Sequence, residues 1–262
     1  MLLLLSPAKS LDFEPLSGDL AQLPHTLPAF PKQTQELIGV LRDLSVQEIA
    51  ELMHLSDKLA SLNVARYLAW RPKFSAKNSK QAVLAFDGDV YTGLDAATLK
   101  PNDLLWAQDH LALLSGLYGV LRPLDWMQPY RLEMGTHLQT GKSHNLYGFW
   151  GKKIAQHLNK CLTTRNESIV VNLASQEYFK AVDLQTLKAR VVECVFEDYK
   201  NGQYKIISFF AKQARGLMAR YIVQKRLDTP AKLKKFNSAG YAFAPEVSNA
   251  DRLVFRRKIA AQ

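Results

Sequence analysis

Short runs of mainly apolar residues recur along the chain and predict buried strands. They occur at 2–5, where four leucines precede Ser6-Pro7, and again at 82–86 and 169–173. A run of four or five apolar residues has the length of a strand buried on both faces, whereas helices usually need about ten residues or more. These runs therefore predict the inner strands of a sheet.

A β-hairpin is predicted in the last third of the chain. Asn201-Gly202 stands between the β-prone runs 191–199 and 204–209. Asn-Gly favours the type I′ turn, whose twist matches that of two antiparallel strands. The two runs should therefore pair directly with each other.

Longer segments carry apolar residues at the three-to-four-residue spacing of a helix. The spacing predicts helices within 32–70, 103–114 and 146–162. In the first of these, Ser45 followed by a glutamate three residues later is a capping box that starts a new helix. A further break is expected at Leu55-Ser56-Asp57.

The order of these elements indicates the fold class. Strands and helices follow one another without strict βαβ alternation, and no Gly/Ser/Pro-rich linker divides the chain. This pattern is typical of an α/β (mixed α+β) fold with a mixed sheet flanked by helices. We expect one domain over residues 1–262.

Composition excludes several classes of protein. Of 262 residues, 47% are apolar, which is too many for a disordered chain. The apolar run at the N-terminus covers only Met1–Leu5, far short of the roughly 20 residues of a membrane span, and it lacks the features of a signal peptide. Two cysteines cannot form a disulfide framework. We therefore expect a cytoplasmic protein.

The positive charge is concentrated at the C-terminal end. The net charge is +10, yet residues 1–199 hold 20 Lys/Arg against 21 Asp/Glu, while residues 200–262 hold 14 against three. Such asymmetry predicts a polyanionic partner, and nucleic acid before an anionic membrane surface. The alternative is a solvated cationic face that serves solubility.

The predicted helix 209–226 carries much of this charge. Its apolar residues gather on one side at about 100° per residue, namely Phe210, Ala214, Leu217 and Tyr221. Its basic residues are the candidate nucleic-acid contacts: Lys212, Arg215, Arg220, Lys225 and Arg226. Gly216 lies on the charged side, where its missing side chain would admit another backbone or a phosphate. The alternative is an ordinary surface helix with basic residues near its negative end.

Residues 45–69 predict two short helices that meet at a tight turn. They loosely resemble a helix-hairpin-helix, which grips DNA phosphates without reading bases. Lys58 and Arg66 would be additional phosphate contacts. The turn lacks the paired glycines of that motif, so a plain helical turn is the alternative.

Charged residues also follow two of the predicted strands, or lie in glycine-bearing segments. The candidate anion-binding cleft comprises Lys9, Arg122, Arg131, Glu133 and Glu177, joined by Lys212. The cations would clamp the anion, and a glutamate would orient them or act as a general base. The alternative is that these ions pair with one another and that the glycines only form turns.

Other chemistry finds little support in the sequence. The six histidines show no paired spacing typical of metal ligands, and no nucleophile-elbow, Walker or Rossmann motif occurs. We therefore predict no metal site and no cofactor, and no catalytic residue is assigned. Direct iron sequestration fits poorly because the acidic residues are dispersed.

Several motifs together resemble a known family. They are Ser-Pro-Ala-Lys at 6–9, Ser-Asp-Lys-Leu-Ala at 56–60, Gly-Asp-Val-Tyr-Thr-Gly at 88–93, the glycine- and arginine-bearing segment 114–125, Pro-Tyr-Arg-Leu-Glu-Met-Gly at 129–135, Asn-Leu-Ala-Ser at 172–175, Ala-Arg-Gly-Leu-Met at 214–218 and Phe-Asn-Ser at 236–238. The chain resembles the bacterial YaaA family of peroxide-stress resistance proteins over essentially its full length. The resemblance implies a cytoplasmic mixed α/β protein that keeps unincorporated iron low during peroxide stress. It also implies DNA binding through a basic cleft and a helix-hairpin-helix-like element.

Two hypotheses of function follow. The first is a peroxide-stress protein that binds duplex or branched DNA by its structure and not by its sequence. The second is an enzyme that acts on a phosphorylated or nucleotide-like small molecule in the Lys/Arg/Glu-lined cleft. Neither hypothesis requires a membrane, and the sequence leaves the oligomeric state open.

Overall fold

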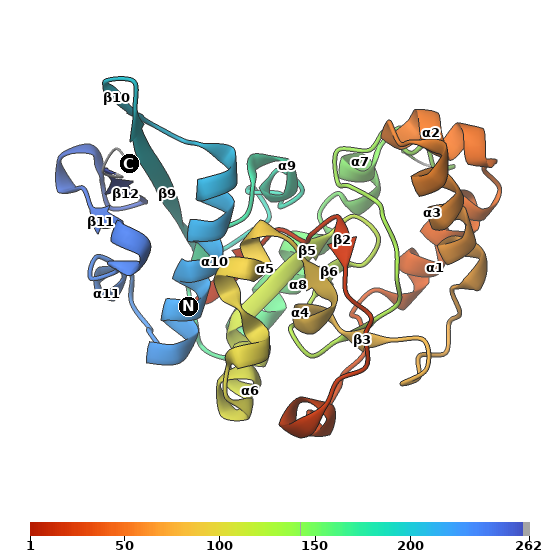
Figure 1. Cartoon of the computed structure of the whole chain (residues 1–262), viewed down its shortest axis with the longest axis horizontal. Helices are drawn as coiled ribbons and strands as arrows, with labels where there is room; N and C mark the ends of the chain where they lie inside the picture. The colour runs from red at the N-terminus through yellow and green to blue at the C-terminus, as the bar shows by residue number, and fades with distance from the viewer. Residues whose placement is uncertain (142, 259–262) are drawn as a thin grey trace.

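An eight-stranded mixed sheet forms the centre of the computed structural model, which describes residues 1–141 and 143–258 (Figure 1). The strands lie in the order β11-β12-β9-β8-β1-β5-β6, and β10 pairs with β9. Their bounds are β1 Leu2–Leu5, β5 Leu111–Ser115, β6 Gly119–Leu121, β8 Ile169–Asn172, β9 Arg190–Lys200, β10 Gln203–Lys205, β11 Ala242–Phe243 and β12 Arg252–Arg257. Two small ribbons pair β2 (Ser10–Leu11) with β4 (Phe86–Asp87) and β3 (Lys80–Gln81) with β7 (Trp126–Met127). The mixed α/β class is thereby confirmed.

Strand β1 lies inside the sheet and runs parallel to both of its neighbours. Leu3 is in register with Leu111 of β5 on one side and with Val171 of β8 on the other. All four leucines of β1 are buried, as expected for a parallel strand covered on both faces. The chain visits β5 first and reaches β8 later, so the sheet has its topological switch point at the carboxyl end of β1. Ligands of open α/β sheets usually bind at such a point.

Helices cover the sheet and extend it at one end. Their bounds are α1 Pro31–Arg42, α2 Val46–Met53, α3 Asp57–Ala69, α4 Ala82–Ala85, α5 Asp89–Leu94, α6 Pro101–His110, α7 Leu146–Trp150, α8 Lys153–Thr164, α9 Gln176–Phe179, α10 Ser208–Lys225 and α11 Pro230–Leu233. Short 3-10 turns occupy η1 Gly18–Gln22, η2 Ala96–Thr98, η3 Ser238–Gly240 and η4 Pro245–Val247. In Figure 1, α1–α3 (red to orange) lie at the end of the molecule opposite β9–β12.

The predictions that rest on local chemistry are confirmed. Ser45 caps α2 and forms the capping box with Glu48. Asn201 and Gly202 have φ values of 55° and 83°, the positive values that a type I′ turn requires. The second strand of this hairpin ends at Lys205, earlier than predicted, because α10 begins at Ser208.

Two apolar runs adopt structures other than those predicted. The segment 82–86 is a helical turn, α4, followed by one strand residue, and its first amides donate to the carbonyls of Asp125 and Pro123. The predicted helix 103–114 ends at His110 and continues as β5. Both errors have one cause: a short buried apolar run fits either a helical turn or a strand.

The predicted helix 146–162 is in fact two helices. Gly151, with φ 44°, ends α7, and α8 begins at Lys153. Periodicity missed this break because the apolar spacing continues across it. Glycine alone adopts this backbone conformation at little cost.

Helix α10 is where predicted, but its buried face is different. The buried residues are Ala211, Ala214, Gly216, Met218, Ala219, Ile222 and Val223, whereas Leu217 and Tyr221 are only half-buried. A Cβ atom on Gly216 would lie 1.8 Å from the carbonyl oxygen of Val90, and one on Gly93 would lie 2.1 Å from that of Gln213. The backbones of α5 and α10 are therefore in direct contact. Gly216 admits another backbone, which was one of the two roles expected of it.

Candidate functional site

The carboxyl ends of β1 and β8 are tied together by two serines. The backbone amide of Ser175 donates to Oγ of Ser6 at 2.8 Å, and the two hydroxyl groups lie 3.3 Å apart. The hydroxyl of Tyr91 donates to the Ser6 carbonyl at 3.1 Å. Burial raises the pKa of Tyr91 well above its usual value, so this hydroxyl remains a donor. These hydrogen bonds fix the backbone at the switch point of the sheet.

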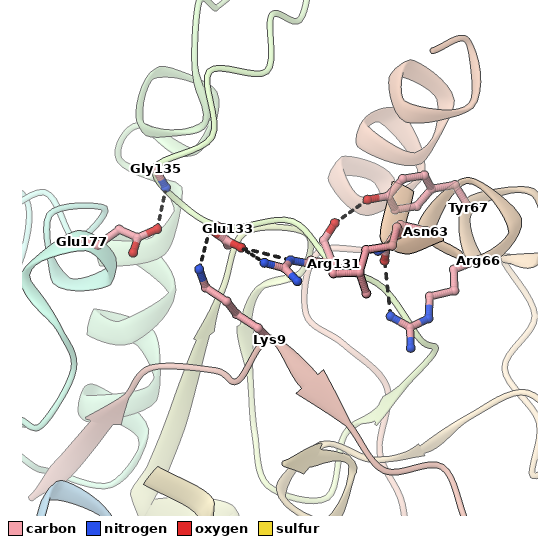
Figure 2. Close-up of polar contacts among 9 residues, drawn as sticks. Lys9, Asn63, Arg66, Tyr67, Arg131, Glu133, Gly135 and Glu177 are labelled. Carbon is pink, nitrogen blue, oxygen red and sulfur yellow. Dashed lines mark hydrogen bonds and ion pairs between the residues drawn. The ribbon is translucent and has the colours of Figure 1, made fainter. Parts of the chain in front are cut away.

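Three charged side chains lie close together just beyond the switch point: Lys9, Arg131 and Glu133 (Figure 2). We call them the edge cluster. Lys9 Nζ lies 3.1 Å from Oε2 of Glu133, and Arg131 Nη2 lies 3.0 Å from Oε1. One carboxylate therefore serves two cations. The Lys9 side chain is 62% exposed, so the cluster presents an excess positive charge to solvent.

Glycines bring the segment that carries Glu133 against the sheet. A Cβ atom on Gly116 would lie 2.2 Å from the carbonyl oxygen of Leu132, so no other residue fits there without displacing this segment. Gly135 donates its amide to Oε1 of Glu177 at 3.0 Å. Glu177 thus holds the backbone near Glu133, and Figure 2 shows it beside the edge cluster.

Helix α3 approaches the edge cluster from the other side, as Figure 2 shows. The Tyr67 hydroxyl donates to the carbonyl of Arg131, and burial raises the pKa of Tyr67. Arg66 donates only to Oδ1 of Asn63, at 3.3 Å. No carboxylate within residues 1–141 and 143–258 forms an ion pair with Arg66. Burial lowers its pKa, and the charge of Arg131 lowers it further.

Arg122 lies apart from the edge cluster, against the expected convergence. Its Nη2 pairs with Asp125 at 3.4 Å. It lines a small cavity with Leu2, His157 and Cys161, near the amino ends of the parallel strands. The reason is topological: β6 runs antiparallel to β5 and carries Arg122 back toward the opposite edge of the sheet.

The basic residues of α10 are largely neutralised by α5 and its neighbours. Lys212 lies 3.9 Å from Asp89, Arg220 lies 3.8 Å from Asp95, and Arg226 lies 3.7 Å from Asp103. Arg220 also donates to two backbone carbonyls. These pairs form because the α5–α10 contact brings the acidic residues of the near-neutral part of the chain against the basic helix.

The two remaining cations of α10 differ from these three. Arg215 is half-buried, and burial lowers its pKa while the charge of Glu193 opposes that shift. Lys225 is exposed, with its Nζ 5.5 Å from the centre of the Tyr221 ring. Lys212 was expected to join Lys9, but Lys212 pairs with Asp89 whereas Lys9 pairs with Glu133. Lys212 therefore does not belong to the edge cluster.

The last strand shows the same compensation. Arg252, Arg256 and Arg257 of β12 pair with Glu193, Glu197 and Asp198 of β9, the residues opposite them in the parallel register. Part of the C-terminal charge excess is thus paired with acidic residues of β9. Other cations of this region, such as Lys234 and Lys235, are exposed and form no ion pair among the described residues.

The α2–α3 hairpin exists, with His54 in the left-handed conformation at the turn. Asn63 and Tyr67 of α3 are buried, whereas Leu59 is 39% exposed and Ala65 is exposed, although apolar spacing favours both as inward residues. Lys58 projects into solvent near the start of α3. The hairpin shows no glycine-lined backbone surface, so its likeness to a helix-hairpin-helix remains a resemblance.

A large cavity beside α3 escaped the sequence analysis. It has a volume of about 760 Å³ and lies between the loop before η1, the end of α3 and the β3–β7 ribbon. Arg66 and Trp70 form part of its wall. The Pro-rich segment 14–31 was the available signal, because long loops often carry binding residues.

The described part of the chain was also searched for metal sites and membrane-spanning helices. Within it, no group of three or more His, Cys, Asp or Glu side chains is placed to hold a metal ion. Nor does any helix there combine the length and apolar character needed to cross a membrane.

The fold and the edge cluster define an α/β protein with a cation-rich group at the switch point of a parallel sheet. A family model described as peroxide stress protein YaaA matches residues 1–247, and the chain belongs to this family. Relatives named UPF0246 protein cover it almost completely. Those from Paracidovorax citrulli and Delftia acidovorans are each 63% identical over 99% of this chain and 100% of their own length. One from Ralstonia pickettii is 58% identical with the same coverage.

Proposed function

We propose that this protein acts in peroxide stress by binding DNA, with α3 and the edge cluster as its phosphate-contacting surface. The observation that carries the proposal is the uncompensated charge there: Arg66 has no carboxylate partner among the described residues, and Lys9 and Arg131 share one. A phosphate oxygen would supply the missing counter-charge. Backbone contacts of this kind select the structure of DNA and not its base sequence.

The contribution of each cation follows from its partners. Lys58 and Arg66 contact phosphate directly in this proposal, since neither forms an ion pair in the described structure. Lys212, Arg220 and Arg226 already face acidic groups, so they add only to the long-range attraction of DNA. Exposed Lys225 adds to that same field.

A titration with DNA tests the proposal. We expect the affinity for a short duplex and for a four-way junction to fall steeply between about 50 and 200 mM salt. Lys58→Ala combined with Arg66→Gln should weaken binding about tenfold and reduce the salt dependence. The matched control is Lys212→Ala with Arg226→Gln, which removes two cations that already have partners. Binding that ignores salt, or a control as damaging as the test variant, contradicts the proposal.

Limitation of free iron is proposed on family membership alone. DNA-bound protein would shield the sites at which iron and peroxide react. Cells lacking the protein should contain more chelatable iron after peroxide exposure, and the Lys58→Ala, Arg66→Gln variant should fail to restore the normal level. Full restoration by that variant would separate the iron effect from DNA binding.

A second candidate function is favoured by the position of the edge cluster at the topological switch point. There the cluster could hold the phosphate of a small substrate, with Glu133 as general base. A thermal-shift screen against phosphorylated metabolites tests this, since a ligand that binds only the folded state raises the unfolding temperature. No shift at millimolar concentration argues against it.

A further inference from the structure

The cavity of about 760 Å³ beside α3 is large enough for a small organic ligand. Ligand pockets usually measure roughly 300 to 1,000 Å³ and combine apolar walls with a few polar groups. Its wall comes from segments distant in sequence: Phe13 to His25, the end of α3 and the β3–β7 ribbon. It lies outside the edge cluster, and the proposed DNA contact does not require it.

Flat aromatic rings form much of the wall. His25 and Trp126 are stacked with ring centroids 3.4 Å apart and an angle of 1° between their planes, and both line the cavity. Trp70 lines it as well, and its Nε1 is engaged with the hydroxyl of Tyr118 at 3.2 Å. Trp70 is only 3% exposed, so the accessible ring surface comes mainly from His25 and Trp126. Such walls favour a planar, unsaturated ligand.

The charged groups of the wall are mostly positive. Arg66, Lys77 and Lys80 line the cavity together with one acidic residue, Glu14. Lys80 is buried and paired with Asp12 at 3.3 Å, whereas Lys77 is exposed. Arg66 is half-buried without a carboxylate partner in the described structure. An uncompensated, partly desolvated cation is costly, and an anion in the cavity would relieve that cost.

One buried side-chain amide, that of Gln81, has an oxygen that accepts no hydrogen bond from the described residues. Gln81 is 6% exposed and lines the cavity. Its Nε2 faces the carbonyls of Leu23 and Pro24 at 3.4 and 3.5 Å, while no described residue donates a hydrogen bond to its Oε1. This oxygen is available to an N–H group of a ligand.

We propose that this cavity binds a nucleoside phosphate. The base lies against the wall formed by His25 and Trp126, and the phosphate pairs with Arg66. Gln81 accepts a hydrogen bond from the base. This site shares Arg66 with the proposed DNA contact, whereas its other residues, His25, Trp126 and Gln81, take no part in that contact.

Titration of the intact protein with free nucleotides tests the proposal. The probes are the diphosphates of adenosine, guanosine, cytidine and uridine, with adenosine and pyrophosphate as fragments, followed by tryptophan fluorescence and calorimetry. At least one nucleoside diphosphate should bind, and at least tenfold more tightly than either fragment. If no nucleotide binds at millimolar concentration, or if pyrophosphate binds as tightly as the nucleotides, the proposal is overturned.

Variants locate the site and separate it from DNA binding. His25→Ala and Arg66→Gln should each weaken nucleotide binding at least tenfold, and thermal unfolding checks that both variants fold. Lys58→Ala, on the exposed side of α3, should weaken DNA binding and leave nucleotide binding unchanged. Unchanged nucleotide affinity in both His25→Ala and Arg66→Gln overturns the inference. Nucleotide binding without DNA binding would instead contradict only the proposed function.

Discussion

Helices α3 and α10 both carry arginines, yet these differ in whether an acidic residue faces them. On α10, the cations Lys212, Arg220 and Arg226 face acidic residues of α5, its C-cap and α6. On α3, Arg66 has an asparagine as its one side-chain partner in the part of the chain that the structure describes. Of the five cations of α10 and its C-cap, three are therefore already paired, and only Arg215 and Lys225 form no ion pair among the described residues. Available charge depends on the neighbours that the fold supplies, and less on the count along the chain.

The largest effect on stability is expected at the α5–α10 contact, which brings the acidic residues against α10. Gly216→Ala places a methyl group against the backbone of α5, so it should lower the free energy of unfolding by about 3 kcal/mol. Gly39→Ala is the matched control, because nothing lies within 4 Å of its Cβ position in α1, and it should stabilise by about 0.5–1 kcal/mol. Urea denaturation measures both. Equal effects would show that α5 and α10 are not packed backbone to backbone.

Removing the acidic partners should make α10 resemble α3. Asp89→Asn, Asp95→Asn and Asp103→Asn together free three cations, and we expect DNA affinity at low salt to rise about tenfold with a steeper salt dependence. Fluorescence anisotropy with a labelled duplex measures this. An unchanged affinity would mean that α10 lies too far from the DNA for its charge to matter.

A smaller gain is expected at the edge cluster. Glu133→Gln removes the one carboxylate shared by Lys9 and Arg131, so DNA should bind about threefold more tightly at low salt, in keeping with a partly exposed pair. Glu197→Gln, which removes the partner of Arg256 on β9, is the control and should change affinity less. Weaker binding by Glu133→Gln would instead assign Glu133 a positioning role.

The smallest effect is a loss of stability at alkaline pH, where buried tyrosines ionise. One of them, Tyr67, attaches α3 to the backbone of Arg131. Burial raises the pKa of Tyr67 and raises that of Tyr118 to about 12. Above pH 10 the unfolded chain releases these protons first, so stability is fully present below about pH 10 and declines as pH rises toward the folded-state values. Tyr67→Phe should flatten this decline, as measured by urea denaturation at several alkaline pH values. The same slope in wild type and variant would contradict it.

The sequence predicted those features that depend on neighbouring residues. The leucines of β1, the Ser45–Glu48 capping box and the Asn201-Gly202 turn are examples, since each is determined within a few positions. Lys9, Arg131 and Glu133 do lie together, but they pair with one another, which was the alternative to an anion-binding cleft.

Features that depend on distant segments could not be predicted. The acidic partners of Arg220 and Arg226 come from residues more than a hundred positions away, and the spacing within α10 carries no information about them. Arg122 was misplaced because the antiparallel direction of β6 is a property of the sheet and not of its own sequence. The cavity beside α3 was missed for the same reason.

The exposure of Lys9 has a consequence for the speed of binding. Its ammonium group is held by a single ion pair on a flexible side chain, and exposed side chains change rotamer in picoseconds to nanoseconds. An incoming phosphate therefore meets a partner that reorients far faster than two molecules diffuse together. We expect association at this edge to follow the encounter rate, with no slower rearrangement of the backbone before capture.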